Sequence, residues 1–80
     1  MAHRTYVRVI VEYDEEGGVH PLEIRWEDGR KFRVERVLDV RRAAATKAGV
    51  QGIRYTCRIL GQETYLFEDR GRWFVEAKEN

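Results

Sequence analysis

Apolar and polar residues alternate along most of this chain, and the alternation predicts β-strands. In the segment 5–13, one face is apolar while Arg8 and Glu12 lie on the other. A period of two residues is typical of a half-buried strand. The apolar face of that first strand comprises Val7, Val9, Val11 and Tyr13. A second such face, after Pro21, comprises Leu22, Ile24 and Trp26. Further strands are expected from Phe32, from Ile53, around Tyr65–Phe67 and up to Ala77.

The parity of the flanking residues predicts the length of the turn at Asp28-Gly29. A two-residue turn would pair Trp26 with Lys31 and set a charge against the core. A three-residue loop with Gly29 in the left-handed conformation pairs Ile24 with Phe32 instead, so we predict the longer loop. The same argument at Asp69-Arg70-Gly71 predicts another odd loop. It would pair Phe67 with Trp73 and Tyr65 with Val75 in an aromatic cluster.

The strand that starts at Phe32 loses its alternation near Arg36, where a bulge or sharp bend is expected. The alanine-rich stretch 43–48 favours one short helical turn, with Gly49 as its C-cap. We therefore predict an all-β fold of about six strands, an antiparallel meander curled into a small barrel. Residues 1–80 are expected to form a single domain, with an ordered core over about 5–77.

The cysteine content and the length of the apolar runs indicate the compartment in which the protein is expected. The 80 residues include one cysteine, so an internal disulfide is excluded and a reducing, cytoplasmic setting is expected. No run approaches the roughly 18–20 apolar residues that span a bilayer, so no membrane association is predicted.

The net charge is only +1, but it is unevenly distributed. Between Arg25 and Arg58 there are ten Lys/Arg and four Asp/Glu, and the two ends carry five basic and ten acidic residues. The asymmetry has two interpretations of similar weight: an uneven barrel exterior, or a site for nucleic acid or another partner. The candidate binding residues are Arg25, Arg33, Arg41, Arg42, Lys47, Arg54 and Arg58.

Catalytic chemistry finds little support, and neither an enzyme nor a cofactor is predicted. Cys57 occupies an inward strand position and is expected to be a buried thiol. His3 and His20 lack partners at metal-ligand or triad spacing, so no metal is predicted either. The acidic loop at 14–16 is expected to be solvated. Asp39 is expected to pair with Arg41 or Arg36, or to cap a turn.

Several motifs resemble a family of small bacterial β domains of unknown function. The first is Trp26-x-x-Gly29-Arg-x-Phe32-x-Val34, which runs into Val37-Leu38-Asp39. The closing Gly71-Arg-Trp73 also fits, and the likeness covers about residues 20–76. The chain departs from the family at Arg41-Arg-Ala-Ala-Ala-Thr-Lys, where a tryptophan-rich segment is common. The resemblance implies the fold more than an activity. Some relatives accompany DNA-repair polymerase genes, which favours nucleic acid.

Two functions are therefore expected. The first is a non-catalytic protein-interaction or structural module, because a small antiparallel barrel has short edges that accept a partner strand, including one from a second copy. The alternative is binding of single-stranded DNA or RNA through the arginine-rich middle of the chain.

Overall fold

The computed structural model describes residues 2–43 and 52–78. This part of the chain forms seven strands and contains no helix, which confirms the predicted all-β class. The strands are β1 (Ala2–Tyr13), β2 (Val19–Arg25), β3 (Lys31–Arg33), β4 (Arg36–Ala43), β5 (Gly52–Ile59), β6 (Gln62–Asp69) and β7 (Arg72–Lys78). The predicted helical turn at 43–48 lies outside the described residues, apart from Ala43, which ends β4.

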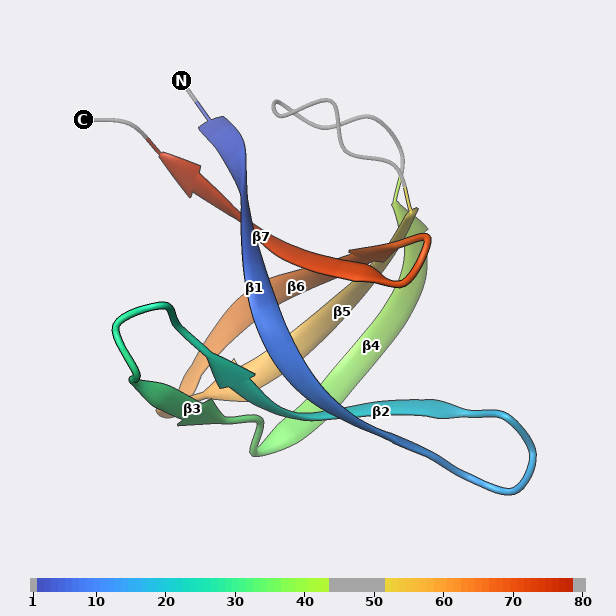
Figure 1. The fold of residues 1–80 in the computed structure, drawn as a ribbon. Helices are drawn as coiled ribbons and strands as arrows, with labels where there is room; N and C mark the ends of the chain where they lie inside the picture. The colour runs from blue at the N-terminus through green and yellow to red at the C-terminus, as the bar shows by residue number, and fades with distance from the viewer. Residues whose placement is uncertain (1, 44–51, 79–80) are drawn as a thin grey trace.

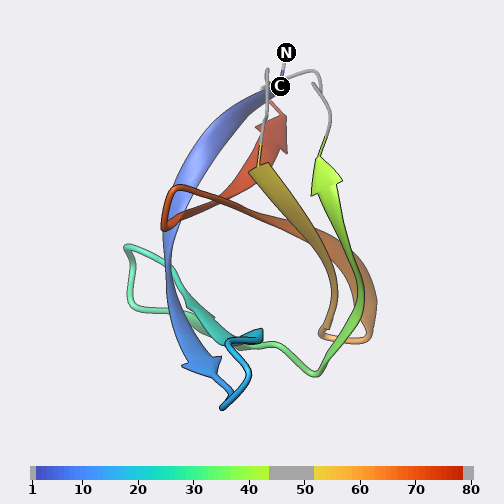
Figure 2. The same ribbon diagram turned by 90° about the vertical axis from the view of Figure 1, so that its right-hand side faces the viewer.

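All seven strands belong to one antiparallel sheet, in the order β3-β2-β1-β7-β6-β5-β4. The long β1 is shared between two halves, because its residues 2–7 pair with β7 and its residues 8–13 pair with β2. Figure 1 shows β1 crossing in front of the strands β4 to β6. Figure 2 shows the sheet curled around a common centre, as an open barrel.

The structure has one strand more than the roughly six that the sequence predicts, because the strand expected from Phe32 is divided into β3 and β4. The division falls at Val34 and Glu35, close to the bend expected near Arg36. β3 and β4 then lie at the two opposite ends of the sheet. The short connection between them therefore spans the opening of the barrel, as Figure 1 shows.

Two bulges alter which side chains face the core. Leu22 has no partner in the register between β1 and β2, and Leu38 has none between β4 and β5. An unpaired extra residue reverses the alternation beyond it and bends the strand. Leu22 is consequently 42% exposed, so its predicted inward position was wrong, and Pro21 is buried in its stead.

The first hairpin has the predicted three-residue loop. Ile24 pairs with Phe32, and the N–H of Trp26 donates to the carbonyl oxygen of Arg30 at 2.9 Å. Gly29 has a φ of 91°, the left-handed conformation that the prediction required.

The predicted odd loop at Asp69-Arg70-Gly71 was wrong. Asp69 pairs directly with Arg72, which leaves a two-residue turn of Arg70 and Gly71. Both residues have positive φ, 54° and 81°, as a tight turn of the primed type requires. Phe67 therefore pairs with Phe74 and not with Trp73.

The sheet buries side chains on both of its faces. The main core contains Leu66, and we call the face that carries it the core face. Adjacent Phe67 points to the opposite face, here the second face, where it forms a smaller cluster with Phe74 and Ala43. The buried residues of the main core are Ile24, Val34, Tyr55, Cys57, Ile59 and Leu66.

Candidate binding surface

Three of the predicted basic residues lie together on the second face. Arg41 of β4 and Arg54 of β5 are register partners. Arg58 is four residues further along β5 and lies opposite Arg36. Because residues two or four apart on a strand share a face, these arginines project from the same side of the sheet.

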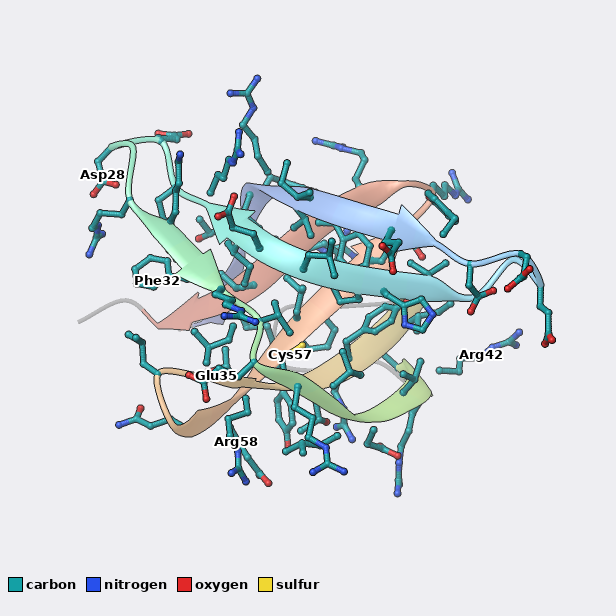
Figure 3. The ribbon with its side chains drawn as sticks, turned by 90° about the horizontal axis from the view of Figure 1, so that it is seen from below. Asp28, Phe32, Glu35, Arg42, Cys57 and Arg58 are labelled. Carbon is teal, nitrogen blue, oxygen red and sulfur yellow. The ribbon has the colours of Figure 1, made fainter. Side chains whose placement is uncertain are left out.

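The other predicted residues lie elsewhere. Arg25 of β2 and Arg33 of β3 are at the far end of the sheet. Both lie beside Glu23: Arg25 forms an ion pair with Glu23 at 2.8 Å, and Arg33 is the register partner of Glu23. Arg42 lies opposite Ile53, on the core face, and Figure 3 shows it pointing in a different direction from Arg58. Lys47 lies outside the described residues. The seven candidates therefore do not form one patch.

Acidic residues separate the arginines on the second face. Asp39 accepts a hydrogen bond from Arg41 Nε at 2.6 Å, which confirms one of its predicted roles. The remaining acidic register partners come from the C-terminal part of the chain, which the sequence marks as acidic. They are Glu63 opposite Arg58, Asp69 opposite Arg72, and Glu76 opposite Arg4. Acidic and basic side chains are therefore interspersed on this face, although only Glu63 and Arg58 join an acidic end of the sequence to its basic middle.

A row of aromatic rings crosses the second face, and the sequence reasoning missed it. We call Tyr6, Phe74, Phe67 and Tyr65 the aromatic row. Phe67 and Phe74 are stacked with their centroids 5.3 Å apart, and Tyr6 meets Phe74 edge-on at 5.5 Å. Tyr65 is 48% exposed, and its predicted pairing with Val75 was wrong because the register between β6 and β7 covers only Phe67–Asp69 of β6.

Arginines cover the rings of this row. The guanidinium of Arg72 lies 3.9 Å from the centroid of Tyr6, and that of Arg54 lies 4.4 Å from Tyr65. Arg4 lies over Phe74 at 4.6 Å. Such contacts contribute about 0.5–1 kcal/mol each at exposed sites. The available signal was the spacing of two residues in Arg4-x-Tyr6 and Arg72-x-Phe74, which sets a cation and a ring on one face.

The outer edge of β4 has no partner strand among the described residues. β4 pairs with β5 on one side only, and it ends the sheet. Its exposed side chains include Val40, which is 52% exposed although it lies on the core face opposite the buried Tyr55. Arg36, Arg41 and Arg42 are also exposed. An unpaired edge with an uncovered apolar residue is a template for another strand.

The remaining groups have structural roles. Cys57 is fully buried, and burial raises the pKa of its thiol to about 11. Asp14 closes its own loop by accepting hydrogen bonds from the N–H groups of Glu16 and Gly18, and it also bonds His20 Nε2 at 2.8 Å. The hydrogen bond with His20 is the largest of the contributions that lower the pKa of Asp14 below its usual value. No group of three or more His, Cys, Asp or Glu residues that could hold a metal occurs within the described ranges.

A shallow hollow of about 400 Å³ lies where β1 changes partners, between Tyr6–Val9 and Gly71–Trp73. It presents Arg8 and Arg72 and no acidic, thiol or imidazole group. We therefore assign it no chemistry.

The described part of the chain contains no helix that is long and apolar enough to cross a membrane. Comparison of the chain with protein-family models, with curated proteins and with solved structures found no match.

Proposed function

We propose that this protein is a non-catalytic interaction module that binds an extended protein segment along the outer edge of β4. The observation that carries the proposal is the outer side of β4 (Arg36–Ala43), at the end of the sheet, which pairs with no other described strand. Backbone hydrogen bonds to such an edge supply affinity, and the flanking side chains supply specificity.

The opposite end of the sheet, formed by β3 and β2, is a poorer acceptor. β3 is only three residues long, so it offers few hydrogen bonds. β2 extends beyond β3, but Pro21 lies in that stretch and has no N–H to donate. β4 contains no proline, and it carries the most exposed apolar side chain of its strand at Val40.

Binding without catalysis is supported by the state of the reactive groups. The thiol of Cys57 is buried, and the carboxylate of Asp39 is engaged by Arg41. We also propose a cytoplasmic location, because the single cysteine has no second cysteine in the chain for a disulfide.

The experiment is a selection of peptides from a random library, followed by NMR mapping of the bound peptide on the labelled protein. Shifts concentrated in Arg36–Ala43 are expected. A control peptide with the same side chains and N-methylated backbone amides should not bind, because it lacks the donors for the sheet. Selected peptides that bind away from β4, or tolerate full N-methylation, would contradict the proposal.

Single-stranded nucleic acid is a second candidate, supported by one specific group. Arg54 stacks on the exposed Tyr65, with its register partner Arg41 beside it and Arg58 on the same face. Small barrels bind single strands through basic residues and stacking aromatics. The interspersed acids on this face and the guanidinium that occupies the ring of Tyr65 make it the weaker candidate.

Titration of labelled oligo(dT) and oligo(rU) at low salt tests this candidate. Binding should weaken steeply as salt rises. The double variant Arg41→Glu/Arg54→Glu should abolish it, while Arg25→Glu/Arg33→Glu, at the other end of the sheet, should leave most of it. No binding at low salt would eliminate nucleic acid.

A further inference from the structure

We propose that the partner of the β4 edge is the β4 edge of a second copy of this chain, in an antiparallel pair centred on Val40. This inference rests on the proposed function of β4 and adds the identity of the bound strand. It follows from the order of side chains in Asp39-Val40-Arg41, which is self-complementary when two copies run in opposite directions.

The charges define the register. Centring the pair on Val40 sets Asp39 of each copy directly opposite Arg41 of the other. Both side chains lie on the second face, as their contact at 2.6 Å within one strand shows, and both are substantially exposed, 42% and 68%. Opposite charges directly across an antiparallel pair are stabilising, whereas like charges are destabilising.

The present bond between Asp39 and Arg41 does not oppose this arrangement. It joins two exposed side chains, and exposed ion pairs contribute little to stability. In the paired edge, each carboxylate lies between two guanidinium groups, one from its own strand and one from the other copy. The ring of four alternating charges that results is more favourable than two separate surface pairs.

The core face supplies the apolar part of the contact. Val40 is the residue on the two-fold axis, so it meets its own equivalent. It is 52% exposed in the single chain, although its register partner Tyr55 is only 3% exposed. Pairing of the edges therefore covers an apolar side chain that the open barrel leaves uncovered.

The flanking positions fit the same register. Leu38, which is 36% exposed at the bulge, comes opposite Arg42 of the other copy. The aliphatic stem of an arginine covers apolar surface while its charged end remains in water. Arg42 lies on the core face and Arg41 on the second face, so the arginines of the two copies do not stand directly opposite each other.

The bulge at Leu38 keeps the regular contact short, and the dimer should be correspondingly weak. The structure describes β4 only to Ala43, which leaves regular strand from Asp39 to that residue. A dissociation constant on the order of 100 μM is expected, since a contact this small is typical of transient association. A two-fold pair of this kind also closes on itself and gives no filament through β4.

Sedimentation velocity on the full chain, from about 10 μM to 1 mM so that the expected midpoint is bracketed, tests the inference with a charge swap. Arg41→Asp and Asp39→Arg each place like charges opposite each other, and each should weaken the dimer at least tenfold. A mixture of these two variants should form a heterodimer, and the double variant Asp39→Arg/Arg41→Asp should dimerise like the parent. Arg33→Asp makes the same charge change on β3 and should have no effect. Circular dichroism identifies any variant that fails to fold.

A parent chain that stays monomeric at the highest concentration would overturn the inference. So would folded single variants that dimerise normally, or a mixture that does not associate. These outcomes are distinct from failure of the proposed function, because a monomer whose selected peptides still map to β4 keeps the edge as a protein-binding site with a different partner.

Discussion

The backbone N–H of Glu35 donates a hydrogen bond to the carbonyl oxygen of Arg58 at 2.8 Å, and this bond attaches the chain to the far end of the sheet. One residue earlier, the N–H of Val34 donates to the carbonyl oxygen of Leu22 at 2.9 Å. Two adjacent residues thus hold β2 and β5, which are four places apart in the strand order. Figure 3 shows Glu35 at this junction, between Phe32 and Arg58.

Truncation of the Val34 side chain in this short connection should destabilise the fold. Val34→Ala removes a side chain that is 8% exposed and packs in the main core. We expect a loss of about 2 kcal/mol in the free energy of unfolding, from lost burial and the cavity left behind. Urea denaturation measures it. The control Arg33→Ala, exposed and one residue away, should change the midpoint little.

Burial on both faces of β6 leads to a second prediction. Leu66 and Phe67 lie on opposite faces of β6, and both side chains are at most 1% exposed. The test variants are Leu66→Ala and Phe67→Ala. We expect each to destabilise the fold by about 3–5 kcal/mol. Tyr65→Ala, on the same face as Phe67 but 48% exposed, should cost less than half as much. Equal effects of Tyr65→Ala and Phe67→Ala in urea denaturation would contradict a packed cluster on the second face.

The two hairpins show what sequence parity can and cannot predict. At Asp28-Gly29 the residue with positive φ is a glycine, and the flanking apolar residues give only one sensible register. At Arg70-Gly71 an arginine also adopts positive φ, which its residue type does not favour. Parity failed there because Phe67 and Leu66 are both buried, so neither face of β6 is a solvent face.

The fold class was predictable because alternation is local, whereas the binding surface depends on strand order. Nothing in the residues near Val34 indicates that β3 and β4 lie at opposite ends of one sheet. The free edge of β4, the aromatic row and the mixture of charges on the second face all follow from that order. The bulges at Leu22 and Leu38 were equally hidden, because a bulge reverses the parity on which the prediction relied.

A close backbone approach at the start of β5 supplies a third prediction. Gly52 has a φ of 123°, and a Cβ there would overlap the carbonyl oxygen of Glu68. Gly52→Ala should therefore destabilise the fold by about 2 kcal/mol or more, from backbone strain and the clash together. Gly29→Ala is the matched control: its φ is 91°, but nothing lies within 4 Å of the added atom. It should cost only about 1 kcal/mol. Equal losses in thermal or urea denaturation would show that strain alone matters.

Buried Cys57 predicts that stability falls in alkaline solution. Burial raises the pKa of its thiol from 9.0 to about 11 in the folded chain. Above pH 9 the unfolded chain releases a proton that the folded chain still retains, so rising pH favours unfolding. The stabilising contribution is complete below pH 9 and is lost as pH approaches 11. The loss should reach about 2 kcal/mol.

Urea denaturation between pH 7 and pH 11 measures this slope, with Cys57→Ala as the comparison. The variant should be less stable at neutral pH because of the cavity, but its stability should fall less between pH 9 and 11. Burial is also the main cause that raises the pKa of Tyr55, so Tyr55 adds a further loss of stability above pH 10. The variant Tyr55→Phe isolates this contribution. If Cys57→Ala retained the full slope between pH 9 and 11, the thiol would not be its source. Labelling with a thiol reagent is a parallel test. A Cys57 thiol held in the core reacts only when the chain unfolds, whereas fast labelling of the folded protein would contradict its burial.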